Sequence, residues 1–370
     1  MNAPAQTLKA TDAGFVAADM GQSSGGPLAS DADRAACRDL IKTGSRSFYA
    51  ASLLLPEAIR DGAYALYGFC RLSDDAVDIG QGQMGAVTRL RARLDGIYSG
   101  APEDHAADRC LSDTVRQFAI PRALFDALME GFEWDATGRH YHSLADVEAY
   151  GERVAGSVGG MMAALMGARS PEMVERACDL GVAMQLTNIA RDVGEDAHNG
   201  RLYLPRDWMV DMGIDPEAWL ACPLFEPELG QIVARLLARA DELYKRADQA
   251  IARLPATVRP AIFAARLLYA EIGVVIARHK YDSLTTRATT TAGRKAWLVG
   301  AAMQRAAKPV PKARLNVEQG LQRPLVAAFV QEPLPTPQSP KAGTSVTDDI
   351  HWVIDLFAEL EQRDRRARLR

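Results

Sequence analysis

This 370-residue chain lacks the sequence features that mark several common classes of protein. Its five cysteines include no CxxC pair, which argues against a disulfide framework or a structural zinc site and favours a reducing, cytoplasmic compartment. We find no apolar run of about 18 residues and no signal-peptide pattern at the N-terminus, so we expect neither a membrane span nor secretion. A formal net charge of -4 gives no basic field, so we expect no nucleic-acid partner.

Alternating runs typical of β-strands are also missing. From residue 31 to 305 the sequence is rich in Ala, Leu, Arg and Glu, and apolar residues recur every three or four positions. Gly and Pro interrupt this pattern near residues 99–105, 120–123, 167–172, 198–207 and 221–230. The sequence therefore predicts one large all-α domain, a single helical bundle.

The two ends of the chain differ from the domain in composition. Residues 1–30 are rich in Ala, Gly, Ser and Asp, and we expect a flexible tail. Residues 306–346 are rich in proline, which predicts a linker or a loosely docked extension. Residues 347–370 predict an amphipathic helix with an arginine-rich end. That helix could dock on the domain with its basic end in solvent, or contact anionic lipid.

Two acidic clusters, DDAVD at 74–78 and DVGED at 192–196, are the most informative feature. Residues four apart share a helix face, so Asp74 and Asp78 project together, as do Asp192 and Asp196. Carboxylates this close repel one another unless a cation offsets their charge. Mg²⁺ suits such a site because it takes a few carboxylates and leaves other positions to phosphate oxygens.

Each cluster continues a polar stripe along its helix. The first stripe contains Tyr67, Arg71, Asp74 or Asp75, and Asp78, and the second contains Gln185, Asn188, Asp192 and Asp196, flanked by Arg191 and Glu195. Both stripes run through apolar surroundings, so we expect them to line a central cavity of the bundle. The alternative is a pair of amphipathic helices with solvated outer faces.

Two further segments are weaker signals. In GSRSFYAASLLLP, Arg46 could grip a phosphate with help from the hydroxyls of Ser45 and Ser47, although a helix start explains the pattern equally well. In YGERVAGSVGGMMAALMG, small residues permit close helix packing or leave room for a bulky chain. His140 and His142 are two apart and point to different sides, so we expect a surface loop there.

Taken together, GSRSFY, YALYGFCRLSDDAVD, YGERVAGSVG and LTNIARDVGEDAHNGRLYLP resemble the squalene/phytoene synthases, and among them the bacterial phytoene-forming members. The resemblance covers residues 35–300. It implies the isoprenoid synthase fold and head-to-head condensation of two geranylgeranyl diphosphates, through prephytoene diphosphate to phytoene. Mg²⁺ and arginines would stabilise the leaving diphosphate, and an apolar pocket would shield the carbocation.

The resemblance also implies roles for individual residues. The metal would be held by carboxylates and one amide: Asp74, Asp75, Asp78, Asn188, Asp192, Glu195 and Asp196. Diphosphate would be bound by Arg46, Arg71, Arg191, Tyr203 and Arg287, with Gln185 and Asn188 completing the second site. The pocket would be lined or ordered by Ser45, Ser47, Tyr67 and Tyr269. Tyr150 would lie near the reacting carbons and steady a cation or help to remove a proton.

The expected cofactor is Mg²⁺, with Mn²⁺ as an alternative, and no NADPH is expected because the chain has no Gly-rich dinucleotide motif. The product would be a water-insoluble hydrocarbon, so we expect peripheral contact with the inner face of the cell membrane. The oligomeric state is left open.

Other functions are weighed against this interpretation. A C30 squalene or dehydrosqualene-type synthase would use farnesyl diphosphate in the same mechanism. Chain-elongating prenyltransferases usually carry DDxxD in both motifs and lack the YxxxVAGxVG segment. A non-catalytic prenyl-lipid-binding assembly factor should have lost one set of carboxylates, and both are present here. A Ser-His-Asp hydrolase lacks support because no GxSxG motif occurs.

Overall fold

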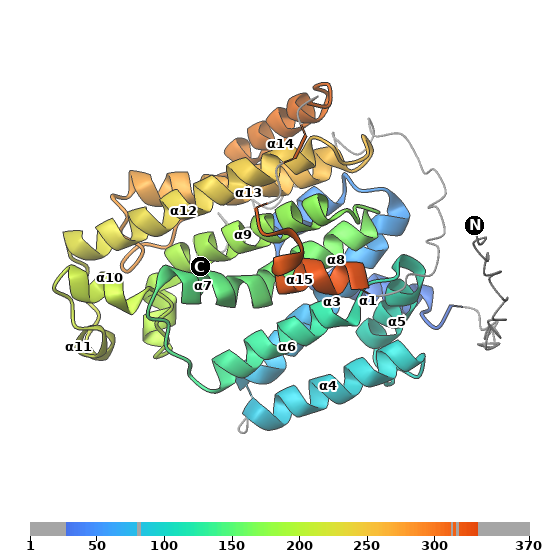
Figure 1. Cartoon of the computed structure of the whole chain (residues 1–370), viewed down its shortest axis with the longest axis horizontal. Helices are drawn as coiled ribbons and strands as arrows, with labels where there is room; N and C mark the ends of the chain where they lie inside the picture. The colour runs from blue at the N-terminus through green and yellow to red at the C-terminus, as the bar shows by residue number, and fades with distance from the viewer. Residues whose placement is uncertain (1–26, 80–82, 312–313, 316–317, 332–370) are drawn as a thin grey trace, which may run out of the picture.

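The computed structural model describes residues 27–79, 83–311, 314–315 and 318–331, and all the regular elements in this part of the chain are helices (Figure 1). The predicted all-α fold is therefore confirmed. In chain order the elements are α1 (Asp31–Gly44), α2 (Arg46–Ser52), α3 (Glu57–Ile79), α4 (Gln83–Ser99), α5 (Ala106–Phe118), α6 (Arg122–Ala136), α7 (Leu144–Gly151), the π-helix η1 (Glu152–Gly156), α8 (Ser157–Leu165), α9 (Pro171–His198), α10 (Arg206–Asp211), α11 (Pro216–Ala221), α12 (Pro227–Ile251), α13 (Arg259–Arg278), α14 (Ala292–Ala306), the 3₁₀-helix η2 (Gly320–Gln322) and α15 (Pro324–Gln331).

Local sequence explains where the main helices begin. Ser30 caps α1 and accepts a hydrogen bond from the backbone N–H of Asp33, whose carboxylate accepts in return from Ser30. Ser170 caps α9 by accepting from the backbone N–H of Met173, and Pro171 occupies the first turn, where the missing N–H costs nothing. The side chains of these loops thus satisfy backbone groups that would otherwise lack partners.

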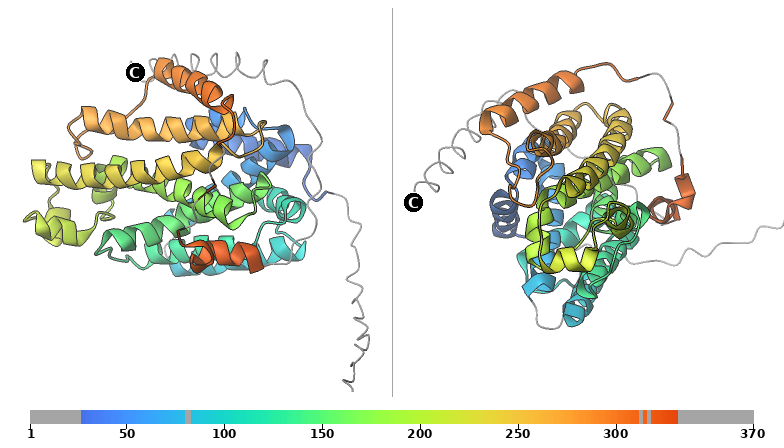
Figure 2. Two further views of the ribbon diagram at one scale, coloured as in Figure 1. Left: turned by 45° about the horizontal axis from the view of Figure 1, so that its top comes forward. Right: turned by 90° about the vertical axis from the view of Figure 1, so that its left-hand side faces the viewer.

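Helix α9 is the central element of the bundle and contacts α12, α13, α8, η1, α7 and α15 (Figures 1 and 2). Two glycines let it approach its neighbours closely. A Cβ atom at Gly181 would lie 2.1 Å from the carbonyl oxygen of Ala155, and one at Gly159 would lie 2.2 Å from that of Ala177. Because backbone faces backbone here, α9 is fixed tightly against η1 and α8.

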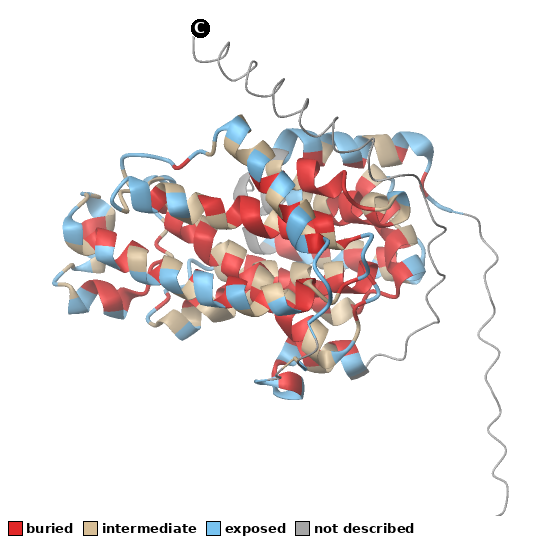
Figure 3. Cartoon of the chain, turned by 90° about the horizontal axis from the view of Figure 1, so that it is seen from above, coloured by how far each residue is buried: buried red, intermediate tan, exposed pale blue. Residues whose placement is uncertain are grey.

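Two apolar clusters fill the interior, and the burial colouring of Figure 3 shows buried faces turned inward with exposed residues on the outer turns. Phe48, Val154 and Leu180 pack against both clusters. These same three residues line the central cavity described below. The cavity therefore lies where the two clusters meet, in the middle of the bundle.

Helix α13 corrects the expectation that the chain contains no apolar run long enough to span a membrane. By length and composition alone, this helix could cross one. Within the fold, 61% of that stretch is buried. Its polar residues are also engaged, since Arg266 pairs with Asp248 at 2.8 Å and Glu271 with Arg294 at 2.8 Å. We interpret α13 as a core helix.

Part of the predicted proline-rich linker is docked. Residues 318–331, which contain η2 and α15, pack on α9, α6 and α8, and Leu325, Val326 and Phe329 are buried. The sequence predicted a linker or a loosely docked extension here, and the burial of these apolar side chains fits the docked extension for this segment. The predicted tail lies outside the described residues up to residue 26, as does the whole of the predicted helix at 347–370.

Candidate active site

The second polar stripe lies on α9 and begins inside the bundle. Gln185 and Asn188 line the central cavity, and Asp192 and Asp196 follow one and two turns further along the same helix. The amide nitrogen of Asn188 lies 3.5 Å from the Gln185 side-chain oxygen, and Asn188 also hydrogen-bonds Tyr269. The stripe predicted from spacing is therefore continuous with the interior.

Asp192 is held by two arginines. Arg191 donates to both of its carboxylate oxygens at 2.8 and 2.5 Å, and Arg287 approaches one of them at 3.0 Å. Arg287 also pairs with Glu195 at 2.8 Å. The structure thus brings four predicted site residues into one ion-pair network, although Arg287 comes from a segment far along the chain.

A glycine in the acidic motif explains how Arg287 reaches this network. The backbone N–H of Gly194 lies 3.1 Å from the carbonyl oxygen of Ser283. A Cβ atom at Gly194 would lie only 2.4 Å from the carbonyl oxygen of Leu284. Only a glycine lets the loop after α13 lie against α9, and that loop carries Arg287 to Asp192.

The same end of α9 is suited to a hard cation. Burial, followed by the negative charge of Asp192, raises the pKa of Asp196 to about 7, so this carboxylate is destabilised as an anion when no cation is near. The side-chain oxygen of Asn188 is buried without a hydrogen-bond partner. Carboxylate and amide oxygens are the donors that Mg²⁺ prefers, so the residues present fit such an ion.

The first acidic cluster is only partly visible. Asp74, Asp75 and Asp78 belong to α3, but their side chains and that of Arg46 lie outside the described part of the structure. Among the side chains that are described, no group of three or more His, Cys, Asp or Glu residues is arranged to hold a metal. The full metal site therefore stays a prediction.

A cavity of about 370 Å³ extends from the polar stripe into the bundle. At its polar end Tyr67, Gln185, Asn188 and Tyr269 are lining residues, and the Tyr269 ring stacks on Phe48 with 4.8 Å between centroids. Most of the remaining wall is aliphatic or methionine. Such a cavity can hold a long hydrocarbon chain with its polar head near Asn188 and keep water away from it.

Tyr150 and Tyr203 meet outside the cavity lining. Their rings stack with centroids 5.2 Å apart, and both hydroxyls donate to the carboxylate of Asp135, each at 2.8 Å. Burial and the charge of Asp135 raise the pKa of both phenols well above their usual range. Both tyrosines are therefore present as neutral phenols, and Tyr203 contacts a carboxylate here.

Sequence reasoning missed Asp135, Tyr141, Phe48 and Gly194. Asp135 follows Trp134 in an ordinary-looking stretch of α6, and nothing in its local sequence marks it. Tyr141 stacks on Tyr203 with centroids 5.8 Å apart and extends the aromatic cluster. For Gly194 a weak signal existed, since a glycine inside a helical pattern lowers helix stability relative to alanine and so suggests a packing role.

The remaining predicted residues are placed as follows. Ser45 caps α2 and accepts from the backbone N–H of Phe48 at 3.4 Å, so it has the structural role considered as an alternative. Ser47 is partly buried on α2. The Arg71 side chain is exposed, on the same helix as the first acidic cluster. His140 and His142 are exposed in the loop before α7, as expected.

Comparisons with known proteins agree with this arrangement. The family model for squalene/phytoene synthase matches residues 41–294. A phytoene synthase from Rhodobacter capsulatus is 53% identical over 74% of this chain and 81% of its own length. One from Cereibacter sphaeroides is 45% identical over 92% and 96%.

Among solved structures, a dehydrosqualene synthase in complex with a ligand is similar, with a TM-score of 0.69 and 31% identity. The match covers 74% of this chain and 96% of that one. The all-α bundle, the cavity that starts at an Asp-rich helix and these matches lead to the same conclusion. This chain belongs to the squalene/phytoene synthase family.

Proposed function

We propose that this protein is a 15-cis-phytoene synthase, a prenyltransferase that joins two molecules of geranylgeranyl diphosphate head to head. The first half-reaction gives prephytoene diphosphate and the second gives phytoene, with release of both diphosphates. The proposal is supported by relatives named phytoene synthase at 53% and 45% identity.

One structural observation carries the proposal. The polar stripe of α9 opens directly into an apolar cavity, so a prenyl diphosphate can place its charged head at Asn188 and Asp192 and its chain among aliphatic side chains. An allylic cation formed at this boundary is kept from water by the cavity wall. Tyr269 and Phe48 present aromatic rings near that boundary, where a ring face can stabilise positive charge.

We propose Mg²⁺ as the metal, held by the predicted carboxylates of both clusters, with Mn²⁺ as the alternative. When bound, the metal would neutralise charge that develops on the departing diphosphate. Asp196 supports this assignment, because its raised pKa shows a carboxylate that gains from a nearby cation. Asn188 adds a buried oxygen without a partner on the same helix face.

Arg191 and Arg287 would act on the diphosphate as well. Arg191 now binds both carboxylate oxygens of Asp192, and Arg287 contacts Asp192 with one nitrogen and Glu195 with the other. A guanidinium can bind a phosphate in a similar two-pronged geometry. If a bound metal offset the charges of Asp192 and Glu195, Arg191 and Arg287 could bind the leaving group instead. They would then stabilise negative charge as the allylic C–O bond breaks.

The final cation would lose a proton, and no hydride from NADPH is needed. The neutral hydroxyl of Tyr150 already donates a hydrogen bond to Asp135. Tyr150 therefore orders the aromatic cluster and does not act as a phenolate base. The product would pass to a membrane from a protein bound at the inner face of the cell membrane. The apolar character of the product is the support for that location.

A C30 synthase that uses farnesyl diphosphate is the second candidate, because the similar solved structure at 31% identity is a dehydrosqualene synthase. Incubation of the purified protein with either diphosphate and Mg²⁺, with and without NADPH, separates the two. Phytoene formed from geranylgeranyl diphosphate in the absence of NADPH is the expected result. A C30 hydrocarbon from farnesyl diphosphate, with no turnover of the C20 substrate, would overturn the proposed substrate.

A further inference from the structure

The cavity follows α9 away from the polar stripe for a long distance. Its lining on this helix runs from Asn188 back to Met173, which is fifteen residues or about 22 Å along the helix axis. Arg176 lies near the far end, about 18 Å from Asn188. Among the described lining residues it is the one that carries a charge. A buried arginine in the wall of a hydrocarbon cavity must be held in place by other charges.

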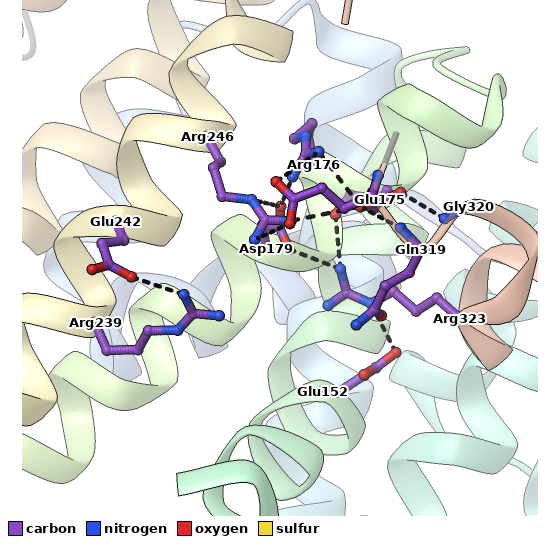
Figure 4. A network of polar contacts seen from close by, with 11 residues as sticks. Glu152, Glu175, Arg176, Asp179, Arg239, Glu242, Arg246, Gln319, Gly320 and Arg323 are labelled. Carbon is purple, nitrogen blue, oxygen red and sulfur yellow. Dashed lines mark hydrogen bonds and ion pairs between the residues drawn. The ribbon is translucent and has the colours of Figure 1, made fainter. Parts of the chain in front are cut away.

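Those charges form a buried network behind the cavity (Figure 4). Arg176 binds one carboxylate oxygen of Asp179 at 2.5 Å, and Arg246 approaches the same oxygen at 3.2 Å. The other oxygen of Asp179 accepts from Arg323 at 2.8 Å. Asp179 therefore links Arg176, at the cavity wall, to Arg323, which comes from the segment after the domain.

Residues 318–331, which we call the C-terminal strap, are bound to α9 by more than Arg323. The carboxylate of Glu175 accepts backbone N–H groups from Glu318, Gln319 and Gly320, at 3.3, 3.4 and 2.9 Å. The Glu175 side chain is only 1% exposed. A buried carboxylate with these donors is well satisfied, and the donors all come from the strap.

Arg323 connects three groups at once. Besides Asp179, it donates to the carbonyl oxygen of Glu175 at 3.2 Å and to the carboxylate of Glu152 at 3.0 Å. Glu152 begins the π-helix η1, which packs on α9 through the glycine contacts described above. One side chain of the strap thus joins α9 and η1, two of the elements whose residues line the cavity.

We propose that the C-terminal strap sets the length of prenyl chain that the cavity accepts, with Arg323 as a positioning residue that acts on Arg176 through Asp179. This inference rests on the proposed function and adds to it the part of the protein that selects the substrate. A C20 chain reaches further from the polar stripe than a C15 chain. A displacement of Arg176 should therefore change the binding of the longer chain much more than that of the shorter one.

The test measures binding, so it does not depend on turnover. Dissociation constants are measured for the unreactive S-thiolodiphosphates of geranylgeraniol and farnesol, with wild type and with Arg323→Met. We expect the variant to bind the C20 analogue about tenfold more weakly and the C15 analogue unchanged, since tenfold is within the range of coupling between neighbouring buried groups. Arg323→Lys should restore part of the C20 affinity because it keeps the charge but not all three contacts.

A matched control loosens the strap elsewhere. Phe329 is buried in the strap, with Arg169 over its ring at 5.3 Å, and it belongs to none of the ion pairs described for Asp179. Phe329→Leu should lower the melting temperature and leave the ratio of the two affinities unchanged. If Arg323→Met behaves like this control, the strap is only structural and the inference is overturned.

A double-mutant cycle tests the route through Arg176. In an Arg176→Met background, Arg323→Met should no longer change the affinity for the C20 analogue, because the residue on which it acts is gone. An unchanged effect would overturn the assignment of Arg323 to Arg176. If the proposed substrate is wrong, the wild-type protein should bind the C15 analogue more tightly than the C20 analogue. This outcome can be told apart from a failure of the inference.

Discussion

Asp192 is bound by the guanidinium groups of Arg191 and Arg287, so it is the best single residue with which to test the diphosphate end of the site. In Asp192→Asn the charge is lost and the shape is kept. We expect turnover of geranylgeranyl diphosphate to fall by about 100-fold or more, the scale of losing one electrostatic group at a reacting centre.

Circular dichroism should show an unchanged fold in Asp192→Asn, and Asp211→Asn, an exposed residue at the end of α10, is the control with normal turnover. Near-normal turnover of Asp192→Asn would show that this carboxylate has no part in the reaction.

Tyr150 gives a second prediction at the residue scale. Its hydroxyl donates to a carboxylate, whereas the hydroxyl of Tyr98 donates to a backbone carbonyl, that of Ile120, at 2.9 Å. Hydrogen bonds to charged groups contribute more, so Tyr150→Phe should lower the free energy of unfolding by about 2 kcal/mol and Tyr98→Phe by about 1 kcal/mol. Urea denaturation measures both. Equal losses would mean that Asp135 does not depend on Tyr150.

Sequence predicted the residues of the α9 stripe because helical spacing is a local property. It did not predict their partners. The resemblance placed Arg287 at the site, but its pairing with Asp192 depends on how the loop after α13 packs on α9. The pairing of Asp135 with two tyrosines depends in the same way on how α6 packs. The capping role of Ser45 was one of the two interpretations that the sequence left open, whereas the exposure of Arg71 was not predicted.

At the scale of elements, the contact between α9 and the loop after α13 depends on Gly194. A Cβ atom there would lie 2.4 Å from the carbonyl oxygen of Leu284, so Gly194→Ala must push the loop away and take Arg287 with it. We expect the KM for the diphosphate substrate to rise about tenfold, as one charged contact is lost.

Gly300→Ala in α14 is the matched control for Gly194→Ala, since no atom lies within 4 Å of its Cβ position. It should keep the KM and stabilise the fold by about 0.5 kcal/mol. An unchanged KM in Gly194→Ala would show that the loop is not needed to bind the substrate.

Most helices could be predicted from composition and from Gly and Pro breaks, and the breaks at 99–105 and 198–207 coincide with real loops. The π-helix η1 and the C-terminal strap could not be predicted in this way. A π-turn has no sequence signature of its own, and α15 is only eight residues long and apolar at almost every position, so it shows no helical period.

At the scale of the whole molecule, acid should weaken the attachment of α1 to α5. The Arg109 guanidinium and the backbone N–H of Ser30 hold the pKa of Asp33 well below its usual range. A lowered pKa in the folded state stabilises the fold above the unfolded value of about 3.9, and this contribution is lost as the pH falls toward the folded value.

Unfolding free energies measured from pH 7 to pH 3 test this. Asp33→Asn should be less stable than wild type at pH 7 and should lose less stability on acidification. Asp31→Asn is the control in the same helix, because the Asp31 side chain is 98% exposed. Parallel pH profiles for wild type and Asp33→Asn would contradict the prediction.

The docking of the C-terminal strap has a consequence for the order of events during synthesis. The buried carboxylates of Glu175 and Asp179 are made early, and so are their ion-pair partners Arg176 and Arg246, whereas the donors of the strap are made last. A nascent chain therefore has these ion pairs before it has the hydrogen bonds from residues 318–323. Docking of the strap is therefore a late step in the folding of this bundle, and it completes the network around Arg176 at the cavity wall.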